Sequence, residues 1–193
     1  MKDSVEDTLG KIEQYFSILR KVLSPDEMSN LENSDIGRLA ICPRGLTVDD
    51  GGEAGALIAF SLQVALKAKA LASAFGVDPK SIVKVSLLHE LGKMGHLSEE
   101  SRQLYLEQDS DWHREKLGQN YKYNPGCSRM NIGHRTLWML SSLGINLNQD
   151  EFVAVLTSQG FHLQENSFYA STAPPVACLL QASRLAVISF SEA

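Results

Sequence analysis

Apolar residues recur along most of this chain at the spacing of a helix face. In the first segment they come every three or four positions, at Val5, Leu9, Ile12, Phe16, Leu19 and Leu23. This spacing predicts one amphipathic helix, which Ser24 and Pro25 end. Ser24 and Glu27 have the spacing of a capping box, with Pro25 at the first helical position. A short second helix is therefore predicted through Met28 and Leu31.

Two longer helices are predicted in the middle of the chain. The first has apolar residues on one face from Leu57 to Phe75 and ends at Gly76. Asp78 and Pro79 supply an N-cap and a first-turn proline for the second helix. Its buried side is expected to carry Ile82, Val85, Leu88 and His89. These two helices contain the densest apolar sequence and should form the centre of the core.

Three more helices are predicted in the C-terminal part. One extends from Ile132 to a stop at Gly144, and Asn148 with Glu151 caps the next. The last begins at the two prolines 174 and 175. Its inward stripe consists of Val176, Leu179, Ser183, Val187 and Phe190. Ser183 is thus predicted on a buried face.

Two stretches lack this periodicity. Residues 33–54 are rich in glycine, and residues 98–130 form a polar, irregular excursion with scattered aromatic residues. No strand with period-two alternation is predicted. The sequence therefore predicts an all-α fold, a compact helical bundle with long loops. We expect a single domain over residues 1–193, with 1–33 as an N-terminal helical extension.

Composition narrows the class of protein. The chain has 193 residues, 44% of them hydrophobic, which is enough for one core, and its net charge of -5 argues against coating nucleic acid or an anionic membrane. Its three cysteines are Cys42, Cys127 and Cys178; without a paired metal spacing they indicate reduced thiols. Lys67 and Lys69 interrupt the most apolar stretch, and the N-terminus lacks a signal-peptide pattern. We expect a cytoplasmic protein.

Four short segments carry a family resemblance. Residues 86–93, Ser-Leu-Leu-His-Glu-Leu-Gly-Lys, resemble the signature of HD-domain phosphohydrolases, an apolar helix that ends in His-Asp before a Gly-Lys turn. Residues 60–65 resemble the family's His-Ser-Leu-x-Val-Ala segment. Residues 132–134 resemble the Gly-His pair of a small bacterial and phage branch, and residues 181–186 its closing Ala-Asp-Arg segment. The four segments occur in the family's order.

The resemblance implies an HD-domain-like helical bundle in which two histidines and two aspartates bind a divalent metal. Such a metal would lower the pKa of its bound water and stabilise charge on a phosphoryl group. This chain departs from that pattern at the ligands. Phe60 stands in the place of the first histidine, Ser183 in the place of the closing aspartate, and His89-Glu90 in the place of His-Asp. We therefore expect no metal cofactor, and only His89 and Glu90 as residual metal positions.

The predicted site is a binding site without a confident catalytic residue. Its ligand-binding residues are His89, Glu90, Lys93, His134, Arg135 and Arg184. Each has a plainer structural interpretation. His89 is also suited to be a hydrogen-bonded core histidine, Lys93 to interact with a helix dipole, and Arg184 to form a structural ion pair.

Three functions are compatible with these residues. The leading hypothesis is a degenerate, non-catalytic HD-domain protein that binds a nucleotide-like ligand, such as a phosphorylated small molecule, or a protein partner. The alternative is a metal-dependent nucleotide or phosphoester phosphohydrolase with a rearranged site drawn from His89, Glu90, Asp49 or Asp50, His134 and His162. Thirdly, aromatic residues between Trp112 and Tyr123 could form a protein contact or a homo-oligomer interface, or pack on their own domain. Neither membranes nor nucleic acids are expected partners.

Overall fold

The computed structural model describes residues 5–97 and 103–190. It is mostly helical, as predicted. The α-helices are α1 (Val5–Leu19), α2 (Pro25–Glu32), α3 (Ala56–Leu71), α4 (Pro79–Leu88), α5 (Asp111–Leu117), α6 (Ile132–Ser142), α7 (Gln149–Leu156) and α8 (Pro175–Phe190). Short 3-10 helices are η1 (Ile36–Ala40), η2 (Val48–Asp50), η3 (Ala72–Phe75), η4 (Leu91–Met94) and η5 (Gln164–Ser171). Two strands complete the described elements, β1 (Tyr105–Glu107) and β2 (Tyr121–Tyr123).

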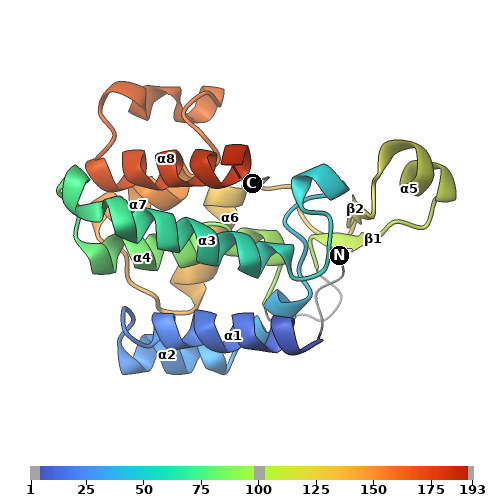
Figure 1. The fold of residues 1–193 in the computed structure, drawn as a ribbon, viewed down its shortest axis with the longest axis horizontal. Coiled ribbons are helices and arrows are strands. Elements are labelled where there is room, and N and C mark those ends of the chain that lie inside the picture. Colours follow the sequence, from blue (N-terminus) through green and yellow to red (C-terminus); the bar gives the residue numbers. More distant parts are fainter. Residues whose placement is uncertain (1–4, 98–102, 191–193) are drawn as a thin grey trace.

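The helices are arranged around the pair α3 and α4 (Figure 1). Helix α8 packs on one side of this pair together with α7, and α1 and α2 cover the other side. Helix α6 packs against η4 and α7. Strands β1 and β2 and the helix α5 that connects them project from the main body, with α5 at the outer end. The α3–α4 pair is therefore the centre of the fold, as its apolar sequence predicted.

Helix ends follow the predicted capping residues. Ser24 with Glu27 and Asn148 with Glu151 both form capping boxes, and the Asp78 side chain accepts from the backbone N–H of Ser81. Such a cap contributes about 1 kcal/mol, because it satisfies backbone donors that the helix leaves unpaired. These local predictions are confirmed.

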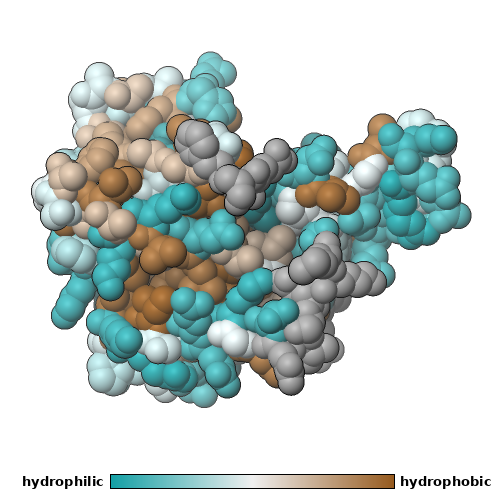
Figure 2. Space-filling view, viewed as in Figure 1, coloured by the Kyte–Doolittle hydropathy of each residue, from teal (hydrophilic) through white to brown (hydrophobic). Residues whose placement is uncertain are grey.

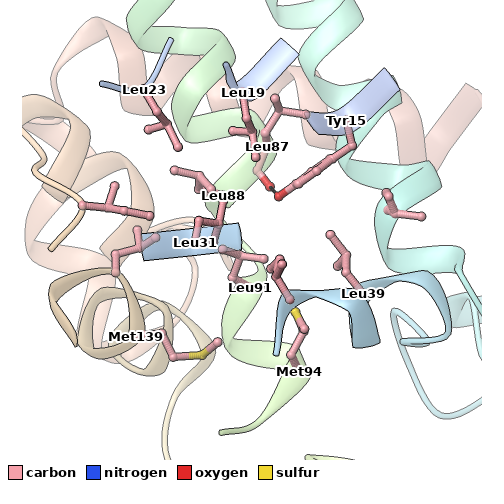
Figure 3. Close-up of a cluster of buried hydrophobic side chains, with 14 of the residues drawn as sticks. Tyr15, Leu19, Leu23, Leu31, Leu39, Leu87, Leu88, Leu91, Met94 and Met139 are labelled. Carbon is pink, nitrogen blue, oxygen red and sulfur yellow. Dashed lines mark hydrogen bonds between the residues drawn. The ribbon is translucent and has the colours of Figure 1, made fainter. Parts of the chain in front are cut away.

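The core between α1, α2 and the central pair differs from the predicted α1 stripe (Figure 3). Leu9, predicted inward, is 55% exposed, whereas Tyr15 is fully buried and its hydroxyl donates to the carbonyl of Leu87 over 2.8 Å. The buried face of α1 is therefore rotated from the predicted one, and it includes Tyr15 rather than Leu9. The phenol can be buried there because its hydroxyl has an acceptor on α4. The side chains of Val5 and Phe190, like residues 1–4 and 98–102 of the predicted extension and excursion, lie outside the described residues.

The segment 103–130 corrects the prediction of a chain without strands. Strands β1 and β2 pair antiparallel, with Tyr105 opposite Tyr123 and Glu107 opposite Tyr121. Each strand has three residues, which is too short to show a period of two. Ser110 caps α5, and Trp112 on this helix is 58% exposed. The fold is thus mostly helical with one small two-stranded sheet.

Within the described residues, Ala56–Phe75 is the one helix that is long and apolar enough to cross a membrane by length and composition. It includes Lys67 and Lys69, which the sequence predicted to interrupt a membrane helix. One face of α3 is buried against α4 and α8, as in the core helix of a globular fold. The hydropathy of this helix is therefore explained by its central position.

An apolar surface lies between α1 and α3 (Figure 2). It is hollowed by a groove of about 510 Å³, whose lining includes Ile18, Leu62 and Leu66 together with several lysines. None of the predicted site residues lines this groove. The site is therefore built elsewhere, from the C-terminal end of α4 and the middle of α8.

Candidate functional site

The C-terminal end of α4 positions His89, Glu90 and Lys93. His89 is the C-cap residue of α4, and the backbone then leaves the α-helix at Glu90 and continues as η4. Gly92 allows α6 to approach this turn: its N–H donates to Thr136 Oγ1 over 3.0 Å, and a Cβ there would lie 2.7 Å from the carbonyl oxygen of Ile132. Close packing of α6 therefore holds the turn that carries Glu90 and Lys93.

The guanidinium of Arg184, on α8, bonds to both residues of the His-Glu pair. Its Nε donates to His89 Nε2 over 3.0 Å, and its Nη2 donates to Glu90 Oε1 over 2.5 Å. Its Nη1 donates to the carbonyl of Ser158, at the end of α7. The structure thus brings together four of the six predicted binding residues, His89, Glu90, Lys93 and Arg184.

These bonds determine the protonation of His89. A guanidinium has no acceptor, so His89 Nε2 must accept, and the ring proton must be on Nδ1. Nδ1 then donates to the carbonyl of Ser86 over 2.8 Å. Burial lowers the pKa of His89 to about 3, and the positive charge of Arg184 also favours the neutral ring. His89 is therefore a neutral imidazole with both nitrogens engaged.

Glu90 is the anion at the centre of this cluster. It is fully buried, and its Oε2 lies 2.9 Å from Lys93 Nζ while Oε1 accepts from Gln159 Nε2 over 3.2 Å as well as from Arg184. Burial alone would raise the pKa of Glu90, but Lys93 and Arg184 hold it well below its usual range. The carboxylate is therefore ionised, with two cations beside it.

Phe60 and Ser183 line the same region from α3 and α8. The Phe60 ring is buried, with its centroid 6.1 Å from that of His89 and 5.8 Å from Arg184 Cζ. Arg44 Cζ lies 4.6 Å from the same ring, a cation–π distance. Ser183 is buried as predicted, and its Oγ has no hydrogen-bond partner among the described residues. An aromatic ring and a neutral hydroxyl thus occupy the two positions where the resemblance implied metal ligands.

These residues do not fit a divalent cation. The lone pair of His89 Nε2 is directed at Arg184, both oxygens of Glu90 face cations, and Phe60 has no lone pair. Over residues 5–97 and 103–190, no group of three or more His, Cys, Asp or Glu side chains could hold a metal ion. A buried guanidinium instead contacts both residual ligand positions.

The remaining predicted residues lie apart from this cluster. His134 and His162 are exposed, and Asp49 and Asp50 are exposed on η2, so the structure does not gather them around His89. Arg135 is buried, but it points elsewhere: Nη1 donates to Cys127 Sγ over 3.3 Å and Nη2 donates to the carbonyl of Ser128. It belongs to a second, separate region.

Sequence reasoning missed three residues that contact the cluster, namely Arg44, Ser158 and Gln159. Ser158 and Gln159 follow the C-cap of α7, and no site residue was predicted there. Ser158 lies three residues after the buried Val155, so helical spacing was an available signal that it faces inward. Arg44 lies in the irregular stretch 33–54, where no periodicity indicates the direction of a side chain.

Comparisons of the chain with protein-family models, with curated proteins and with solved structures gave no match. A functional interpretation must therefore come from the residues and their geometry.

Proposed function

We propose that this chain is a cytoplasmic, non-hydrolytic HD-like domain that binds a nucleotide-like, anionic small molecule. The observation that carries the proposal is the guanidinium of Arg184, which bonds to His89 Nε2 and Glu90 Oε1. In HD-domain hydrolases the corresponding His-Asp pair would hold a metal. Here the guanidinium of Arg184 bonds to both of these positions.

A guanidinium cannot supply the metal's chemistry. It is always protonated and has no open coordination position at which water could be activated. His89 is no substitute as a general base, because its Nε2 lone pair accepts from Arg184 and its pKa is far below neutral. Glu90 is ion-paired to Arg184 and Lys93. The cluster therefore stabilises the fold and lacks a group to start hydrolysis.

Positive charge around the cluster supports binding of an anion. Lys93 and Arg184 both pair with Glu90, and Arg44 adds a third cation over the neighbouring Phe60 ring. A further buried arginine, Arg135, lies on α6. Such local positive charge attracts anionic ligands even in a chain whose net charge is -5.

The test is phosphate release from a panel of nucleoside mono-, di- and triphosphates with Mg²⁺, Mn²⁺ or Co²⁺, together with calorimetric titration of each metal and nucleotide. We expect nucleotide binding, no stoichiometric metal and no metal-stimulated release. Metal-dependent release that is lost in His89→Ala would overturn the proposal and favour the alternative, a rearranged phosphohydrolase.

A variant that reinstates the ligands sharpens this test. Phe60→His, Glu90→Asp, Ser183→Asp and Arg184→Ala together restore the family's ligand types and remove the guanidinium. We expect this variant to bind Mn²⁺ where the wild type does not. Arg184→Ala alone is the matched control, since it removes the guanidinium and adds no ligand.

A further inference from the structure

A second cavity lies beside the His89 cluster. It has a volume of about 910 Å³ and is lined by residues of the segments 123–132 and 159–165, together with Leu104 and Arg135. Among its lining residues is Gln159, which donates to Glu90, so the cavity adjoins the cluster without including His89, Glu90 or Arg184. Cavities of this size hold small-molecule ligands.

Arg135 lines this cavity and has no anionic partner. It is 1% exposed, and its bonds are to a thiol and a carbonyl, Cys127 Sγ and Ser128 O. Its Nε is buried without a hydrogen-bond partner, and in the described part of the chain no carboxylate lies within ion-pair distance of its guanidinium. An unpaired buried charge is costly, so this arginine is expected to have a function that requires its charge.

The other lining residues indicate which further groups a ligand of this cavity would contact. Tyr123 is 61% exposed, and one side of its ring meets Tyr105 at a centroid distance of 5.6 Å, which leaves an aromatic surface at the cavity. Glu165 is the carboxylate of the lining, but it is exposed and accepts from Asn131 Nδ2 over 2.7 Å. The cavity therefore combines a buried cation, hydrogen-bonding amides and an aromatic wall.

We infer that this cavity binds a small phosphate monoester that carries an aromatic ring. The phosphate neutralises the guanidinium of Arg135, and the ring stacks on Tyr123. The inference rests on the proposed function and deepens it, because it separates the binding site from the His89–Glu90 pair. Charge-assisted bonds from a guanidinium to a phosphate are among the stronger polar contacts.

The test compares three probes by calorimetry: phenyl phosphate, cyclohexyl phosphate and inorganic phosphate. We expect phenyl phosphate to bind most tightly. Arg135→Met should weaken it by at least about tenfold, the loss of one charge-assisted contact, Arg135→Lys should weaken it less, and Glu165→Gln should tighten it. Tyr123→Leu should remove the difference between the phenyl and cyclohexyl esters.

Alkylation of Cys127 gives a second readout that is independent of the stability of the variants. In the wild type, bound phenyl phosphate should slow the reaction of Cys127 with iodoacetamide. The exposed Cys178 serves as an internal control and should react unchanged.

Four outcomes test the inference and the proposed function separately. Equal affinity in wild type and a folded Arg135→Met variant, or an unprotected Cys127 at saturation, would place the ligand elsewhere and overturn it while the proposed function stands. Absence of binding by all three probes would also overturn it. Metal-dependent hydrolysis that requires His89, with phenyl phosphate still bound through Arg135, would instead overturn only the proposed function.

Discussion

Two arginines are buried in the described part of this chain, and their surroundings are opposite. Arg184 is 9% exposed and is bonded to Glu90, to neutral His89 and to a carbonyl. Arg135 is 1% exposed and is bonded to a thiol and a carbonyl, with no anion beside it. The more deeply buried cation is thus the one without a counter-charge.

Under the proposal above, the difference separates a structural charge from a ligand-binding charge. Arg184, in the middle of α8, completes the cluster at the C-terminal end of α4, because each of its donating nitrogens has an acceptor there or at Ser158. Arg135 lines a cavity large enough for a ligand that could supply the missing anion. In buried sites, a charge that is already paired contributes to the fold, and an unpaired one leaves interaction energy available for a ligand.

Removal of the anion from the paired cluster should have the largest effect on stability. Glu90→Gln leaves Lys93 and Arg184 as buried cations without a partner, so we expect a loss of about 3–5 kcal/mol in the free energy of unfolding. Urea denaturation measures this. The control is Glu32→Gln, which breaks the exposed pair with Arg20 and should cost at most about 1 kcal/mol. Equal losses in the two variants would contradict a central role for Glu90.

The two arginines should respond differently to the same substitution. Arg184→Met leaves Lys93 as the single cation paired with Glu90. It should lower the free energy of unfolding by about 3 kcal/mol, as expected for a broken buried pair. Arg135→Met removes two hydrogen bonds but also an unpaired charge, so it should cost about 1 kcal/mol or less. Thermal and urea unfolding of both variants provide the measurement. A larger loss for Arg135→Met would reverse the comparison.

Acid should destabilise the cluster through His89. The unfolded chain protonates this histidine near its ordinary pKa of 6.5, whereas the folded protein keeps it neutral to about pH 3. Between these values the unfolded state binds more protons, so stability falls as the pH falls. From pH 7 to pH 4 we expect a loss of about 3 kcal/mol, and His89→Gln should flatten this slope. An unchanged slope in a folded variant would assign it to other groups.

The smallest effect is expected outside both regions, on the projecting α5. Trp112 is 58% exposed, so Trp112→Ala should change the unfolding free energy by less than about 0.5 kcal/mol. Tyr105→Ala is the buried control in the same segment and should cost about 3 kcal/mol.

Sedimentation equilibrium at several protein concentrations tests the interface hypothesis. A mass that rises with concentration in the wild type but not in Trp112→Ala would assign self-association to α5.

Local features of the fold could be predicted from the sequence. Helix starts at Pro25, Pro79 and Gln149 follow from capping residues within three positions of each start, because a cap satisfies donors in its own first turn. The inward direction of His89 and Ser183 follows from helical spacing. The three-residue strands and the rotated face of α1 were not predictable in this way, since each depends on a distant partner.

The sequence by itself therefore determined which residues stand at the positions that the resemblance compares with metal ligands, and that His89 and Ser183 face inward. Only the tertiary structure decided what those residues do. Arg184 reaches His89 and Glu90 across more than 90 positions of sequence, where no periodicity relates them. Similarly, Arg135 was predicted only as a ligand-binding residue, and its burial beside a cavity depends on the fold. Pairing of buried charges is a property of packed helices, and one helix alone cannot specify it.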